Sequence, residues 1–140
     1  LLVNESVYMP VNHFMIPVQL DERLLFSELW VDPDAEGQSR QRGGDEADNT
    51  RRFLFKMDIQ DLGLFDMVLT NRGQQVDLKI FCPPRVAPFA KEIEAALTGI
   101  LTDNGLTATS VQLSQMGKPL TLTEVFPKLF EGKNSINVKV

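Results

Sequence analysis

Residues that bind structural metals or form cross-links are almost absent from this sequence. His13 is its only histidine and Cys82 its only cysteine among 140 residues. A structural zinc site takes several ligands of these types, and a disulfide within the chain takes a pair of cysteines, so the sequence excludes both. Glycine-rich phosphate loops, nucleophile elbows and metalloprotease helices are missing as well. We therefore expect no catalytic, metal-binding or cofactor-binding residue.

The sequence is also short of basic charge and of long apolar runs. It has 14 Lys and Arg residues compared with 19 Asp and Glu residues, and its pI is about 4.8. Such a balance gives no positive field to attract a phosphate backbone, so we expect no nucleic-acid partner. No run approaches the roughly 20 apolar residues of a membrane-spanning helix, so we expect a soluble piece without direct membrane insertion. The single cysteine favours a cytoplasmic location. Because the first residue is Leu1, we interpret the chain as a piece of a longer protein.

Alternating apolar and polar residues are abundant. With 43% hydrophobic residues, residues 1–140 are enough for one domain with a sizeable core. Alternation along residues 65–69 and 76–80 predicts two half-buried strands joined by a tight turn at Arg72-Gly73. This turn pairs residue 69 with 76, 67 with 78 and 65 with 80, all apolar pairs on one face. On the other face the same register pairs Asp66 with Lys79 and Leu64 with Phe81.

A third strand is predicted over residues 53–59 by the same alternation. Pairing Phe55 with Met67 and Phe53 with Leu69 brings Lys56 beside Asp66, in a row that Lys79 would extend. The alternative register sets two aspartates opposite each other, which like charge disfavours.

An N-terminal hairpin is predicted over residues 14–32, with its turn at Asp21-Glu22-Arg23. Pro17 cannot donate to a strand ladder, so the first strand is expected at a sheet edge. The expected pairs are Val18 with Ser27, Ile16 with Leu29 and Phe14 with Val31. Residues 1–12 are interpreted as an extended arm or a short edge strand, and Trp30 as a core residue.

Residues 33–52 contain no large apolar side chain, which predicts a flexible loop that includes Arg40, Arg42, Arg51 and Arg52. The C-terminal extension, residues 114–140, holds a short helix that Thr121 or Thr123 could cap, and a final edge strand or tail at residues 136–140.

From Val86 the period becomes helical, and Asp103-Asn104-Gly105 is a strong helix stop. The residues expected on the packed helix face are Phe89, Ile93, Ala96, Leu97, Ile100 and Leu101. A strand over residues 106–113 follows. The fold class is thus α+β: a mostly antiparallel β-sheet with one long α-helix packed on one face, preceded by an N-terminal β-hairpin.

The sheet face opposite this helix presents four apolar residues in the predicted register: Leu54, Leu64, Val68 and Phe81. Either the N-terminal hairpin or the C-terminal segment covers them, which we favour, or they form a partner-docking surface. Cys82 has the parity of Val76, Leu78 and Ile80, which predicts a packed thiol.

Several motifs in residues 53–113 resemble the C-terminal domain of flagellar hook-length control proteins. They are Asp61-Leu62-Gly63, the alternating residues 65–69 and 75–81, a leucine-containing helix ending in Asn104-Gly105-Leu106, and Val111-Gln112-Leu113. Residues 14–32 also resemble the extra N-terminal strands of divergent members from Gram-positive anaerobes. In such a domain Leu62-Gly63 would set the bend before the hairpin, and Gly105 would end the helix and direct Leu106 inward. Together with Gly73 in the predicted turn, these are structural positions.

The resemblance implies a non-enzymatic regulator of the flagellar type III secretion apparatus. The parent protein would act as a molecular ruler exported through that apparatus, while this domain contacts the cytoplasmic domain of the membrane export-switch protein and changes its substrate specificity. One alternative is a binding or assembly module of another system that shares the fold. A further alternative is an enzyme whose site uses carboxylates such as Glu28, Asp32 and Asp58.

Overall fold

The computed structural model describes residues 11–35 and 49–128, which form six strands and two helical segments. The strands are β1 (Asn12–Leu20), β2 (Arg23–Asp32), β3 (Thr50–Ile59), β4 (Gly63–Arg72), β5 (Gln75–Cys82) and β6 (Thr107–Gln115). Between β5 and β6, a 3-10 turn, η2 (Ala87–Phe89), leads into the helix α3 (Ala90–Asp103), and the short helix α4 (Leu122–Val125) follows β6. This is the expected α+β architecture, although α3 is a modest helix of 14 residues.

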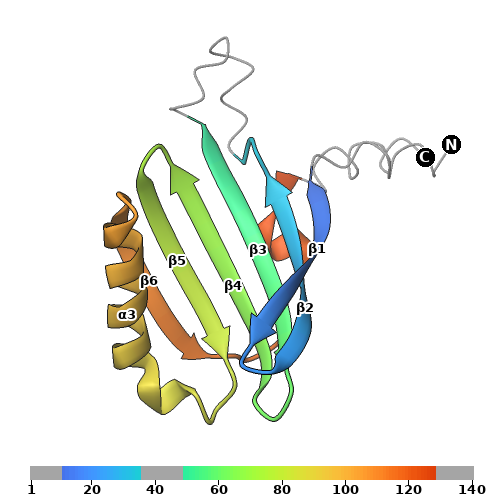
Figure 1. Cartoon of the computed structure of the whole chain (residues 1–140). Coiled ribbons are helices and arrows are strands. Elements are labelled where there is room, and N and C mark those ends of the chain that lie inside the picture. Colours follow the sequence, from blue (N-terminus) through green and yellow to red (C-terminus); the bar gives the residue numbers. More distant parts are fainter. Residues whose placement is uncertain (1–10, 36–48, 129–140) are drawn as a thin grey trace, which may run out of the picture.

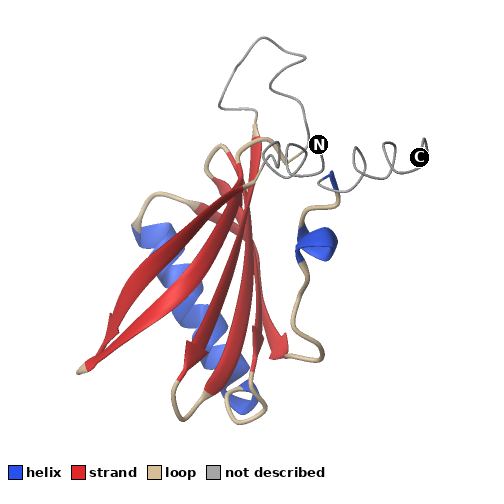
Figure 2. Cartoon of the chain, turned by 90° about the vertical axis from the view of Figure 1, so that its right-hand side faces the viewer, coloured by secondary structure: helices blue, strands red, loops and turns tan. Residues whose placement is uncertain are grey.

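All six strands belong to one sheet, in the order β1-β2-β3-β4-β5-β6 (Figure 1). Neighbours are antiparallel except β5 and β6, which are parallel because α3 returns the chain to the same end of the sheet. The helices α3 and α4 lie on opposite sides of the sheet (Figure 2). β1 is an edge strand, as Pro17 predicted.

The predicted pairing of β3 with β4 is confirmed. Phe55 lies opposite Met67, Phe53 opposite Leu69 and Lys56 opposite Asp66. The charge pair on one face and the apolar pairs on the other therefore predicted the register that the structure shows.

The predicted register between β4 and β5 is wrong by two residues. The turn residues are Gly73 and Gln74, so Leu69 pairs with Leu78 and Met67 with Ile80. Gly73 has φ 60° in the first loop position, where a type II′ turn requires a positive φ. The Asn71 amide supports this turn by donating to the carbonyl oxygen of Gly73 at 2.9 Å. Consequently Asp66 lies opposite Phe81 and Lys79 opposite Val68, so Lys79 does not extend the predicted charge row.

The N-terminal hairpin also has a shorter turn than the sequence suggested. Its loop is Asp21-Glu22, with Asp21 at φ 53°, and Arg23 already belongs to β2. The predicted pairs are therefore wrong by two residues. The observed pairs are Val18 with Leu25, Ile16 with Ser27 and Phe14 with Leu29. Because each shift is two residues, every side chain keeps the face that the alternation predicted.

Part of the predicted loop at residues 33–52 is ordered as strand. β3 begins at Thr50, so Arg51 and Arg52 are strand residues, and the Ala35 amide donates to the Thr50 carbonyl oxygen at 2.8 Å. Outside the described residues lie Arg40, Arg42, the first ten residues of the arm predicted over residues 1–12, and the final strand predicted at residues 136–140.

Buried side chains form one cluster on each face of the sheet. On the α3 side, Leu78, Ile80, Cys82 and Leu113 are buried and Ile93 and Leu97 pack against them. On the other side, Leu54 packs with Val11, Val125 and Phe126. Cys82 is fully buried, which confirms the predicted packed thiol, and its burial raises the pKa of that thiol.

Two of the glycines singled out in the sequence sit at chain reversals near these clusters. Gly63 has φ 119°, and a Cβ placed there would lie 3.1 Å from Cγ of Pro83, so glycine is required where β4 begins. Gly105 follows α3, and the Leu106 amide donates to the Leu101 carbonyl oxygen at 3.0 Å. Leu106 is half-buried, whereas Leu62 remains 41% exposed in the β3–β4 loop.

Candidate protein-binding surfaces

The helix α3 covers only part of its side of the sheet. It packs mainly on β6 and on the buried residues of β5. Among the described residues, no helix lies over β1, β2 or β3 on this side (Figure 1). Apolar side chains of these strands therefore stay half-exposed or exposed, and Phe14 on β1 is 48% exposed.

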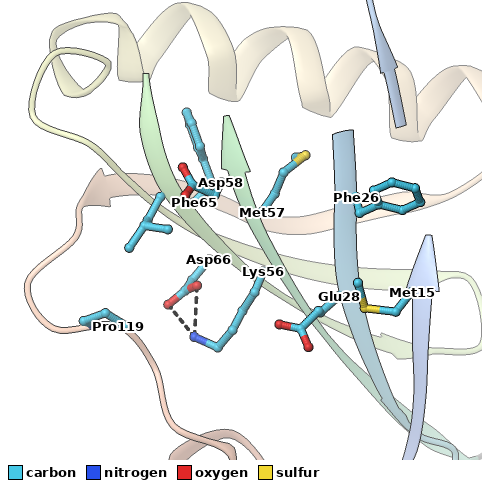
Figure 3. Close-up of a pocket in the computed structure, with 10 residues that line it drawn as sticks. Met15, Phe26, Glu28, Lys56, Met57, Asp58, Phe65, Asp66 and Pro119 are labelled. Atoms are coloured by element: carbon cyan, nitrogen blue, oxygen red, sulfur yellow. Dashed lines mark hydrogen bonds and ion pairs between the residues drawn. The ribbon is translucent and has the colours of Figure 1, made fainter. Parts of the chain in front are cut away.

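A hollow of about 200 Å³, here called the sheet groove, opens on this uncovered area. Its lining residues are Val18, Ser27, Phe55, Met57, Phe65, Met67 and Ile80. Ser27 is the only polar residue among them, and its hydroxyl donates to the Ile16 carbonyl oxygen at 3.3 Å. Figure 3 shows Met57 and Phe65 pointing to the side of the sheet on which α3 lies. The sheet groove thus offers an apolar floor with no charged group.

The side of α3 that borders the groove is apolar as well. Glu94 accepts a hydrogen bond from the Leu113 amide at 2.7 Å, which turns that side of the helix towards β6. With about 3.6 residues per turn, Phe89, Ala96 and Ile100 lie on the opposite flank, towards the middle of the sheet. Phe89 is 57% and Ile100 55% exposed, and Ala96 is exposed as well, so the prediction that these three belong to the packed face is wrong. We call these three residues the α3 stripe.

The opposite face of the sheet is covered where the sequence suggested it would be. Leu54 is fully buried under Val125 and Phe126, and Val68 packs against the same cluster. The C-terminal segment (residues 116–126) therefore covers these two residues, which is one of the two alternatives that the sequence left open. Leu54 offers no surface to a partner in this arrangement, and Phe81 is half-buried opposite Asp66.

Leu64 is the one residue of that predicted set that stays exposed, at 49%. It lines a second hollow, of about 300 Å³, together with Met15, Phe26, Glu28, Lys56, Met57, Asp58, Phe65, Asp66 and Pro119 (Figure 3). Met15 and Phe26 are more exposed than Leu64, at 57% and 58%. Neither was predicted from the sequence, because the face that β1 and β2 share with β3 depends on the β2–β3 register, and no pattern in the connecting residues predicts that register.

The charges beside this second hollow are paired. Nζ of Lys56 lies 3.1 Å from both carboxylate oxygens of Asp66, and Oδ2 of Asp66 also accepts from the Leu120 amide at 2.7 Å. Asp66 is 3% exposed, so this ion pair is a buried clasp between β3, β4 and the C-terminal segment. Nearby, His13 stacks on Trp30 with ring centroids 4.7 Å apart and contacts Glu28 at 3.2 Å.

Of the three acidic residues considered for an enzyme, Glu28 and Asp58 both line the second hollow, whereas Asp32 does not. Asp32 is buried and accepts from the Asp34 amide at 3.0 Å in the turn after β2. Glu28 faces Lys56 across the strand pair, four residues away from Asp32 along β2. Within residues 11–35 and 49–128, no three His, Cys, Asp or Glu side chains gather in a way that could hold a metal ion. The same residues contain no helix long and apolar enough to cross a membrane.

Comparison of the chain with family models, with curated proteins and with solved structures found no match. The protein is therefore defined by its architecture, a six-stranded α+β domain with one half-open apolar sheet face.

Proposed function

We propose that the protein is a non-enzymatic interaction domain of a flagellar hook-length control-like protein. It contacts the cytoplasmic domain of the export-switch protein of the flagellar type III secretion apparatus and thereby changes which substrates are exported. The flagellar part of this proposal rests on the sequence resemblance over residues 53–113. The interaction part rests on one structural observation, the apolar sheet face that α3 leaves open.

An open apolar face of this kind supports binding because soluble proteins rarely leave contiguous apolar area in water. Here the area extends from the exposed Phe14 on β1, through the half-exposed Phe55 and Met57 on β3, to Met67 on β4. The neighbouring edge of the sheet is a poorer docking place, because Pro17 in β1 lacks the amide that an added strand would need. We therefore place the partner on the face of the sheet.

The test is binding of the purified domain to the export-switch cytoplasmic domain, measured by pull-down and by calorimetry. The informative variant is Phe14→Asp, because Phe14 is exposed on the open face and a charge there should not disturb the fold. We expect its affinity to fall at least about tenfold, equivalent to about 1.4 kcal/mol. Leu64→Asp is the matched control, since Leu64 is equally exposed on the other face.

The same pair of variants separates the alternatives. Loss of binding in Leu64→Asp with normal binding in Phe14→Asp would move the docking surface to the second hollow. Val68→Asp is unsuitable as a test, because Val68 packs against the cluster around Leu54 and a buried charge would unfold that region. Absence of any binding by the unmodified domain would contradict the flagellar assignment and leave a module of another system.

A further inference from the structure

We propose that the sheet groove binds a basic amphipathic helix of the partner, laid on the sheet beside α3. The inference rests on the proposed interaction role and deepens it, but it does not depend on the flagellar assignment. Three observations support it: the width of the uncovered sheet, the apolar lining on both sides of the groove and the sign of the charge along its rim.

The width of the uncovered sheet fits one helix. Neighbouring strands lie about 4.8 Å apart, so a step of two strands measures about 10 Å. Packed helices keep their axes about 8–10 Å apart. Since α3 lies over β5 and β6, a second helix at this distance would lie over β3 and β4. That position is where the floor of the sheet groove is found.

Both walls and the floor would bury the apolar side of such a helix. The α3 stripe borders the uncovered part of the sheet with Phe89 and Ile100, each more than half exposed. Val18 of the N-terminal hairpin lines the other side, and the floor includes Met57 and Met67. Methionine side chains are flexible and adapt to varied apolar surfaces, as in known helix-binding grooves. The occupant therefore presents apolar residues at positions i, i+3, i+4 and i+7.

The rim of the groove is acidic. Glu92 and Asp103 fall on the same flank of α3 as the stripe. Glu92 precedes Ala96 by four residues and Asp103 follows Ile100 by three, and residues at these spacings are neighbours on a helix surface. The only basic residue of α3, Lys91, lies on the opposite flank, 3.8 Å from Glu94. Asp21 and Glu22 form the turn of the hairpin at the other side. The neighbouring Arg23 is already engaged, because it lies 3.7 Å from a carboxylate oxygen of Asp61 and donates to the Gln60 carbonyl oxygen at 2.7 Å. With a net charge of −5, the protein favours Lys and Arg beside the apolar stripe of its partner.

This charge pattern also decides between kinds of occupant. A membrane rich in anionic lipid would be repelled by the acidic rim. A second copy that offered its own α3 would bring Glu92 and Asp103 against the same residues of the first copy, which like charge disfavours.

The probe for the test is a synthetic 18-residue peptide with leucine on one helical face and lysine elsewhere, used where the peptide is monomeric. Carbon-13 labelling of the methionine methyl groups reports where it binds. We expect the signal of Met67, which lines the sheet groove and not the second hollow, to shift, while that of Met15, exposed on the opposite face, stays in place. A peptide with glutamate in place of every lysine should bind at least about tenfold more weakly.

Matched variants test the rim directly. The double variant Glu92→Gln with Asp103→Asn should weaken binding of the lysine peptide by about tenfold. The control is Asp58→Asn with Asp77→Asn, which changes the net charge equally on the other face of the sheet and should leave the affinity unchanged. Equal weakening by both double variants would reduce the effect to overall charge and overturn the proposed rim contact.

The remaining outcomes distinguish binding of a basic helix in the groove from binding of the export-switch domain. Shifts confined to Met15 and Met57, which both line the second hollow, would overturn the basic-helix proposal even if the export-switch domain binds. Equal binding of both peptides would overturn it as well. Shifts of Met57 and Met67 that grow with protein concentration in the absence of peptide would identify a second copy as the occupant and overturn it as well. Binding of the lysine peptide in the groove without binding of the export-switch domain would uphold the inference and contradict the flagellar assignment.

Discussion

Asp66 is the residue on which three segments of the chain meet. It belongs to β4, it is paired with Lys56 of β3, and it accepts the amide of Leu120, 54 residues further along the chain. Its side chain is 4% exposed while that of Lys56 is 24% exposed, so solvent screens this pair weakly. A carboxylate placed in this way stabilises the fold only while its partners remain.

Replacing Asp66 should therefore be costly. We expect Asp66→Ala to lower the free energy of unfolding by about 3–5 kcal/mol, because the Leu120 amide and the Lys56 ammonium both lose their acceptor. Urea denaturation followed by Trp30 fluorescence measures this. The control is Lys79→Ala, which removes an exposed lysine from the same face. A change below about 0.5 kcal/mol in Asp66→Ala, the usual range for surface substitutions, would show that the clasp contributes little.

The sequence predicted half of this arrangement. The Lys56–Asp66 contact follows from the β3–β4 register, which opposite charges and apolar pairs select together. The contact with Leu120 could not be predicted, because residues 116–121 carry no periodic pattern and their path depends on where the sheet already offers a buried acceptor.

At the scale of elements, α4 is a very short helix that is held by its capping box. The Thr121 hydroxyl accepts from the Glu124 amide at 3.3 Å, and a Glu124 carboxylate oxygen accepts from the Thr121 amide at 2.8 Å. The hydrogen bonds from the backbone and then the side chain of Thr121 lower the pKa of Glu124 below its ordinary value. The capping box places Val125 and Phe126 over Leu54.

The sign of the pKa shift predicts how α4 responds to acid. Because the pKa of Glu124 is lower in the folded state, its stabilising effect is complete above the ordinary glutamate pKa and is lost as the pH falls through the folded value. We expect amide exchange at Val125 and Phe126 to accelerate as the solution is acidified below about pH 4. Amide exchange measured by NMR from pH 6 to pH 2.5 checks this, after correction for the intrinsic exchange rate.

The control for this prediction is Glu124→Gln, which keeps an acceptor for the Thr121 amide but cannot titrate. In the variant, the same two amides should depend less on pH than in the unmodified protein, while β4 amides behave alike in both proteins. Identical pH profiles at Val125 and Phe126 would show that another carboxyl group controls the segment.

The registers of the strands could be predicted from the sequence only in part. Alternation fixed the face of every strand residue, but a two-residue shift leaves that pattern unchanged, so the pattern could not separate the observed registers from the predicted ones. The turns decided the matter through positive φ values at Asp21 and Gly73. The helical period likewise could not show where α3 lies across the sheet. It included Phe89 and Ile100 in the packed face, although the position of α3 over β5 and β6 leaves them exposed.

At the scale of the whole molecule, one sheet separates two unequal clusters. The α3 side is closed over β5 and β6 and open over β1 to β3, and the other side is closed by the C-terminal segment around Leu54. Which part of a face stays open depends on how far a helix reaches across it, a property of tertiary packing that no stretch of sequence displays. The sheet groove therefore became visible only with the structure.

The order of strands in the sheet is the order of strands in the chain, and this has a kinetic consequence. Each strand can pair with the one before it, so loop closures are short except between β2 and β3 and between β5 and β6. We expect most refolding molecules to become native in one fast phase after dilution from urea, and stopped-flow fluorescence of Trp30 would record it. A dominant phase lasting tens of seconds would instead indicate proline isomerisation or a trapped intermediate. During synthesis, each strand that leaves the ribosome could pair at once with the strand made before it.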